Sequence, residues 1–150
     1  MADYARLIDF FDEYIEHYRE FKTFEVSKLD MLNKNQIEQL SSSLSTEQAL
    51  IMKTNSMETK RMKLLEGVEG TNFTEVIDKA PAEFKGRLSE QHEELSYLIY
   101  KIKELNDIAN GIVSKRLKFI QNKTAELDVY DGKGSVKREH ATKAAILKNV

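Results

Sequence analysis

The 150-residue sequence has no cysteine, one proline and six glycines. Without cysteine the chain can form no disulfide and no thiolate zinc site, and it has no cysteine nucleophile. So few helix breakers favour long helices. No apolar run approaches the roughly 18 residues of a membrane-spanning helix, and the start MADYARLIDFFDEY has acidic residues where a secretory signal would be basic. We therefore expect a soluble, cytoplasmic protein without membrane insertion.

Charge is divided unevenly along the chain. Residues 1–131 hold 24 acidic and 18 basic side chains, whereas residues 132–150 hold one acidic and five basic ones. Nucleic-acid binding would need a basic stripe interleaved with aromatic residues, but no aromatic follows Tyr130. Five bases alone attract phosphate weakly and in a salt-sensitive manner. We therefore expect no nucleic acid among the partners.

Two segments in the first half of the chain repeat apolar residues every three or four positions. This period predicts helices over residues 3–33 and 36–66. Their short connection makes them antiparallel neighbours. Asp3 is a plausible N-cap of the first helix, and Asn33 with Asn35 supplies a stop.

A connector over residues 67–80 has two glycines and one apolar turn, so we expect a short helix that buries little. A third helix follows over residues 81–127. Its heptad seam is interrupted only by Arg116 and consists of Leu95, Leu98, Ile102, Leu105, Ala109, Ile112 and Phe119. The pattern predicts an all-α fold, an elongated antiparallel helical hairpin or three-helix coiled-coil-like bundle with a long third helix. We assign residues 1–127 to a helical domain and residues 128–150 to a C-terminal tail.

The third predicted helix is longer than either of its partners, by about 24 Å at a rise of about 1.5 Å per residue. If the helices begin level, residues from about position 112 onward project past the hairpin. A break at Gly111 or a start displaced by the connector would shorten this projection. We predict an apolar binding face that extends into this projecting part and consists of Ile102, Leu105, Ala109, Ile112, Phe119 and Ile120.

The sequence contains no recognisable motif for catalysis or metal binding. The sequence has no Glu-x-x-His pair, no HExxH motif and no phosphate loop ahead of Gly132 and Lys133. We interpret the dense carboxylates of the third helix as its solvated face. Glu13 and His17, four residues apart, are interpreted as a weak surface contact. We expect no enzymatic activity, no metal and no cofactor.

Two groups of side chains each allow two interpretations. Asn106 and Asn110 are interpreted as surface amides, and the alternative is that they fix the register of the helices or bond to an incoming helix. A methionine group is interpreted as core filling, and the alternative is an adaptable binding surface. That group consists of Met31, Met52, Met57 and Met62.

The order of the segments is characteristic. An aromatic-rich first helix ends in EVSKLDMLNKNQIEQL, and the third helix reads ELNDIANGIVSKRLKFIQNKTAEL before the turn VYDGKG and a short basic tail. This arrangement resembles the FlgN family of flagellar export chaperones over nearly the whole chain. The sequence departs from the family at AAIL (144–147), which is more helix-like than the usual low-complexity tail.

The resemblance implies a cytoplasmic chaperone of type III flagellar export whose cargo is the hook-filament junction proteins. Its apolar face would bind their amphipathic terminal helices, prevent premature assembly and allow delivery to the export gate. Tyr130 would dock on the cytoplasmic domain of the gate, although a tyrosine beside a glycine turn also serves as a cover over a helix end. The alternative function is a structural coiled-coil protein that self-associates as a homodimer through the same seams.

Overall fold

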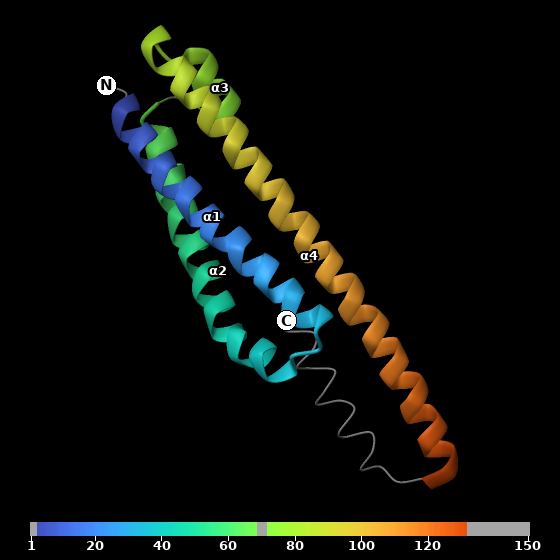
Figure 1. Ribbon diagram of the computed structural model, residues 1–150. Coiled ribbons are helices and arrows are strands. Elements are labelled where there is room, and N and C mark those ends of the chain that lie inside the picture. Colours follow the sequence, from blue (N-terminus) through green and yellow to red (C-terminus); the bar gives the residue numbers. More distant parts are fainter. Residues whose placement is uncertain (1–2, 69–71, 132–150) are drawn as a thin grey trace. The chain divides into compact units, whose positions relative to one another are not determined.

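The computed structural model describes residues 3–68 and 72–131, with the backbone alone for residues 126–131. This part of the chain forms four helices and no strand, which confirms the predicted all-α class (Figure 1). The helices are α1 (Tyr4–Asn33), α2 (Ile37–Glu66), α3 (Phe73–Lys79) and α4 (Ala82–Asp131). Helix α4 is continuous through Gly111 and extends past position 127, where the sequence predicted that the helical domain ends. None of the described helices is long and apolar enough to span a bilayer.

Local hydrogen bonds fix where the helices begin and end. At the start of α1, Asp3 Oδ1 accepts from the Arg6 amide at 3.0 Å, as its N-cap position predicted. After α1, Asn35 adopts the left-handed conformation at φ 55°, which asparagine tolerates better than most residues. Before α3, Asn72 accepts from the Glu75 amide at 2.9 Å. Short polar side chains therefore set these boundaries.

The chain divides into two compact units. Unit 1 comprises Met1–Phe24 and Glu47–Lys103, and unit 2 comprises Glu25–Thr46 and Glu104–Val150. Each long helix contributes to both units because each passes through a boundary between them.

The core of unit 1 is rich in aromatic residues. Its buried apolar members are Leu7, Phe10, Phe11, Tyr14, Ile15, Leu65, Val68, Val76, Ala80, Leu88, Leu95 and Leu98. Helix α3 belongs to this core, since Val76 is fully buried and the Phe73 ring stacks on Phe11 with centroids 4.2 Å apart. The expectation that the connector buries little is therefore wrong. The single apolar turn of α3 places Phe73 and Val76 three residues apart on one helix face.

Polar contacts fix α1 against α2 in unit 1. The buried Tyr14 hydroxyl donates to Glu58 Oε2 at 2.6 Å, and Arg61 Nε donates to both Glu58 carboxylate oxygens at 3.0 Å. The Arg61 guanidinium, and to a lesser extent Tyr14, hold the pKa of Glu58 below its usual value. Burial and the bond to Glu58 raise the pKa of Tyr14. These contacts favour the antiparallel hairpin that the short connection predicted.

His17 is buried in unit 1, at 1% exposed, so its interpretation as a surface contact of Glu13 is wrong. Its Nε2 lies 2.6 Å from Thr54 Oγ1, whose own hydroxyl donates to the Leu50 carbonyl at 2.9 Å. Because Thr54 gives its hydrogen to Leu50, we assign the imidazole hydrogen to Nε2. His17 Nδ1 is buried without a hydrogen-bond partner among the described residues.

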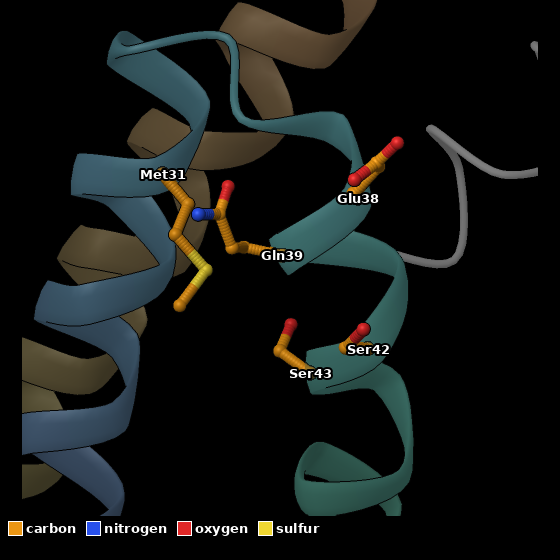
Figure 2. A pocket seen from close by; sticks show the side chains of 5 residues that line it. All are labelled: Met31, Glu38, Gln39, Ser42 and Ser43. Atoms are coloured by element: carbon orange, nitrogen blue, oxygen red, sulfur yellow. The ribbon is translucent and has the colours of Figure 1, made fainter.

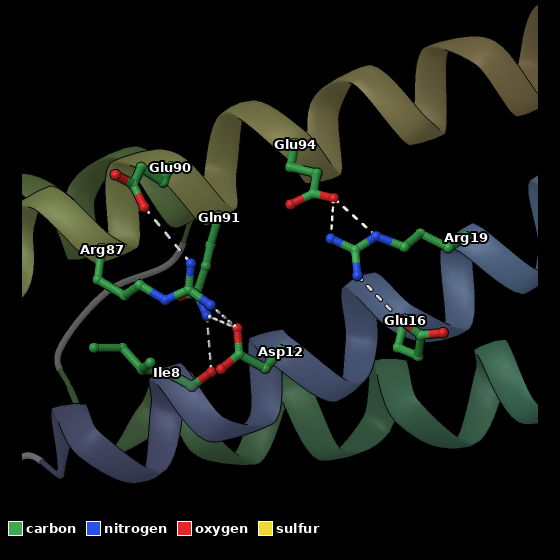
Figure 3. A network of polar contacts seen from close by, with 8 residues as sticks. All are labelled: Ile8, Asp12, Glu16, Arg19, Arg87, Glu90, Gln91 and Glu94. Carbon is green, nitrogen blue, oxygen red and sulfur yellow. Dashed lines mark hydrogen bonds and ion pairs between the residues drawn. The ribbon is translucent and has the colours of Figure 1, made fainter.

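Contacts between α1 and α4 in unit 1 show that these two helices run in the same direction there (Figure 3). Gln91 Nε2 donates to the Ile8 carbonyl and to Asp12 Oδ1, each at 2.9 Å. Further along both helices, Arg19 Nε donates to Glu94 Oε1 at 2.9 Å. Both members of the Arg19–Glu94 pair are substantially exposed, so it contributes little to stability.

Unit 2 has a smaller apolar core. Its fully packed members are Leu32, Leu40, Ala109 and Val113, and the partly buried members packed against them are Leu29, Met31, Leu44, Ile112, Leu117 and Ile120. The turn between α1 and α2 therefore covers α4 as far as Ile120. The expected projection from about residue 112 is wrong, because the closed end of the hairpin supplies partners for these apolar side chains.

Arg116, the residue that interrupts the apolar seam, bonds to the end of α1. Its Nη2 donates to the Leu32 carbonyl, and its Nη1 lies 3.4 Å from Asn35 Oδ1. The last carbonyls of a helix lack partners in their own helix and carry partial negative charge. The guanidinium therefore stabilises the C-terminus of α1 in unit 2.

A buried ion pair lies in unit 2. Lys28 Nζ is 2.9 Å from Glu25 Oε2, and the two side chains are 1% and 3% exposed. Lys28 also donates to Asn106 Oδ1 at 3.4 Å. The interpretation of Asn106 as a surface amide is therefore wrong, because its side chain bonds to Lys28 of α1 in unit 2. Asn110 is exposed.

Candidate binding surface

The structure divides the six residues of the predicted binding face. Ala109 is fully buried in the core of unit 2, and Ile112 and Ile120 are partly buried against it. Leu105 in unit 2 and Ile102 in unit 1 are half-buried. Ala109, Ile112 and Ile120 are thus brought together against the core of unit 2, and only Ile112 and Ile120 keep an exposed part.

Phe119 is the one member of the predicted face that is strongly exposed, at 63%. It lies on α4 between Leu117 and Ile120, yet these two residues pack against the core of unit 2 and Phe119 does not. The Nζ atom of Lys123 lies 5.6 Å from the centroid of the Phe119 ring. An exposed aromatic on a rigid helix offers a large contact area at low entropic cost.

Lysines around Phe119 were not identified as candidate residues from the sequence. Lys115 and Lys118 are exposed and lie within one helical turn of Phe119. No acidic residue occurs between positions 109 and 125 of the chain. A count of charge over residues 109–125 alone, which hold four basic and no acidic side chains, would have shown this basic stretch, whereas a count over residues 1–131 concealed it.

The methionine group has no common environment. Met57 packs against the core of unit 1 and Met31 against that of unit 2, as core filling predicts. Met52 and Met62 on α2 are 70% and 57% exposed. The group therefore forms no single surface, and the core interpretation holds for two of its four members.

A solvent-open depression of about 440 Å³ lies between α1 and the start of α2 in unit 2 (Figure 2). Its lining residues are Met31, Glu38, Gln39, Ser42 and Ser43. The Ser43 hydroxyl donates to the Leu40 carbonyl of its own helix at 2.7 Å, so its hydrogen is not free for a ligand. The depression lacks the convergent polar groups of a small-molecule site.

The described residues contain no group of three or more histidine, aspartate or glutamate side chains that could hold a metal ion. Tyr130 lies in the last turn of α4, but its side chain and the turn that follows are outside the described residues. The candidate site is therefore the exposed part of α4 around Phe119.

A comparison with protein families finds a match over most of the chain. A family model described as "FlgN protein" matches residues 1–136, which include every described helix. No curated protein and no solved structure matches the chain significantly. The family match supports a role as a flagellar export chaperone, a class of proteins that bind other proteins rather than catalyse reactions. By its sequence and its all-helical structure, the chain belongs to the FlgN family.

Proposed function

We propose that this protein is a cytoplasmic chaperone that binds the amphipathic terminal helices of hook-filament junction proteins. Binding covers the surfaces through which these proteins polymerise and so prevents premature assembly. The observation that carries the proposal is the match to the FlgN family over residues 1–136.

The exposed Phe119 supports a binding surface on unit 2. Burial of a phenylalanine side chain contributes roughly 1.5–3 kcal/mol, and ordering a disordered partner segment costs about 2–5 kcal/mol. A surface with one such anchor and several smaller contacts binds reversibly, as a carrier that releases its cargo requires. Ile112 and Ile120, which are only partly buried, extend the apolar surface beside Phe119. Ile102 and Leu105 continue the proposed face along α4.

Ala109 has a different part in the proposal, because it is fully buried. It contacts cargo only if unit 2 opens when cargo binds. Unit 2 has a smaller apolar core than unit 1, so the free energy needed to open it is lower.

Delivery to the export machinery is the second part of the proposal. Tyr130 is proposed to dock on the cytoplasmic domain of the export gate after cargo has bound. Replacing Tyr130 by alanine is expected to leave cargo affinity within about twofold, which is about 0.4 kcal/mol, and to weaken gate binding at least tenfold.

Cargo binding is tested by calorimetric titration of the terminal segments of the junction proteins from the same bacterium. Phe119→Ala is expected to weaken binding at least tenfold while leaving the melting temperature nearly unchanged. Tyr100→Ala is the matched control, because Tyr100 is an equally exposed aromatic on the same helix, also at 63%. The assignment of Phe119 fails if both variants bind like the unmodified protein.

Sedimentation of the free chain tests the alternative of a self-associating structural protein. A stable homodimer that Phe119→Ala dissociates, together with no affinity for junction proteins, would replace the chaperone proposal with that alternative.

A further inference from the structure

The exposed surface of α4 around Phe119 is basic. Four residues of α4 lie on one side of the helix, because Lys115 is followed at three, four and eight residues by Lys118, Phe119 and Lys123. We call this set the lysine face. Among the described residues neither Lys115 nor Lys118 forms an ion pair. The lysine face therefore presents positive charge beside an exposed aromatic ring.

An apolar track runs through the lysine face. Ile108, which is 46% exposed, precedes Phe119 by eleven residues, or about three helical turns and roughly 16 Å. Eleven steps of 100° return to nearly the same side of the helix. Between them, at Gly111, a Cβ atom would meet nothing within 4 Å. The bare backbone there allows another helix to approach α4 closely.

Charge on the face selects among possible partners. Lys115 lies between Ile108 and Phe119, so insertion of these two side chains into a bilayer would carry an ammonium group toward the acyl chains. A partner carboxylate, in contrast, can pair with Lys115 at the edge of an apolar contact. Arg116 is occupied at the end of α1, which leaves Lys115 and Lys118 to make such pairs.

We infer that the lysine face binds an amphipathic helix of a partner protein whose apolar stripe is flanked by aspartate or glutamate. Apolar side chains of that helix pack on Gly111 between Ile108 and Phe119, and its carboxylates pair with Lys115 and Lys118. The identification of this helix with the terminal segment of a cargo protein rests on the proposed function. The charge preference of the face rests on its own residues.

Three synthetic 24-residue peptides test the inference. They share one leucine stripe at helical spacing and carry glutamate, glutamine or lysine at the flanking positions. Binding to the full chain is measured by fluorescence anisotropy at low and at moderate salt. The glutamate peptide is expected to bind at least tenfold more tightly than the glutamine peptide, and salt is expected to reduce this preference.

Charge reversal identifies the face that is responsible. Lys115→Glu with Lys118→Glu is expected to remove the preference for the glutamate peptide and to give a preference for the lysine peptide. Lys85→Glu with Lys103→Glu is the matched control, because it changes the net charge equally at two exposed positions of the same helix. Circular dichroism checks that all variants keep their helices.

Three results would overturn the inference: equal binding of the glutamate and glutamine peptides, no binding of any peptide, or an equal effect of the control pair. Tighter binding to anionic phosphatidylglycerol vesicles than to the glutamate peptide would also overturn it, in favour of a membrane surface. Junction-protein segments are titrated in parallel. If the junction-protein segments bind but the synthetic peptides show no charge preference, the inference fails and the proposed function stands. If the glutamate peptide binds and the junction-protein segments do not, the proposed cargo fails and the inference stands.

Discussion

Units 1 and 2 share the same three long helices but differ in what they bury. Unit 1 buries twelve apolar side chains in one cluster that includes a helix of its own, α3. Unit 2 buries four, together with a lysine–glutamate pair, and leaves Phe119 exposed beside lysines. Because burial of apolar surface dominates stability, the difference indicates that unit 1 contributes more to the stability of the fold, and it supports the proposal that unit 2 provides the binding surface.

The largest contrast is expected between two phenylalanines that occupy these different environments. Phe11→Ala removes a fully buried ring that stacks on Phe73, so it is expected to lower the free energy of unfolding by about 3–5 kcal/mol. Phe119→Ala is expected to change it by about 0.5 kcal/mol or less. Urea unfolding followed by circular dichroism measures both. A loss of several kcal/mol for Phe119→Ala would show that this side chain belongs to the core, and would contradict the difference proposed between the two phenylalanines.

The buried pair of unit 2 gives the next largest effect. Lys28→Met leaves the buried Glu25 carboxylate without its cation and is expected to destabilise the protein by about 3 kcal/mol. Adding Glu25→Leu removes the unpaired charge and is expected to restore most of this loss. Denaturant unfolding of the two variants is the measurement. If the double variant is less stable than Lys28→Met, the pair itself stabilises unit 2 more than apolar packing would.

Arg116→Ala is expected to cost about 1.5 kcal/mol, because it removes a charged hydrogen bond to the Leu32 carbonyl. Lys115→Ala, at the exposed neighbouring position, is the control and is expected to be nearly neutral. Thermal unfolding compares the two. Equal melting temperatures for both variants would show that the end of α1 does not depend on the guanidinium.

A smaller effect, confined to acid pH, is expected at His17 in unit 1. Burial, and secondarily the nearby Lys53, lower the pKa of His17 below 6.5, while Glu20 opposes this shift. The unfolded chain therefore binds a proton at a higher pH than the folded chain, and stability falls as pH drops below about 6.5. The loss can reach about 1.4 kcal/mol per pH unit until the folded pKa is passed.

His17→Gln, which can still donate to Thr54, is expected to flatten the dependence of stability on pH between about 7.5 and 5.5. The free energy of unfolding is measured at several pH values for both proteins. An unchanged slope in the variant would show that other groups titrate in this range.

Periodicity predicted the three long helices well because each has a continuous apolar stripe. It failed for charged side chains inside the bundle. Glu25 and Lys28 have the composition of a solvated helix face, and only the three-dimensional structure shows that they neutralise each other when buried. Helix lengths likewise suggested an overhang, but they contain no information about where the closed end of the hairpin contacts α4.

The candidate site was predicted only in part. Phe119 was identified because its position lies on the heptad seam, yet the structure places it outside the core and Ala109 inside it. A seven-residue repeat drifts around a straight helix, so one seam cannot keep facing one neighbour over many turns. Lys115 and Lys118 were missed because charge was counted over the whole domain.

Amide hydrogen exchange of the full chain is measured with and without a bound junction-protein segment. This measurement tests most directly whether unit 2 binds the partner while unit 1 stabilises the fold. The account predicts that binding slows exchange in residues 109–125 of unit 2 and leaves residues 4–24 of unit 1 unchanged. Slower exchange in residues 4–24, with no change in residues 109–125, would contradict it and place the binding surface on unit 1.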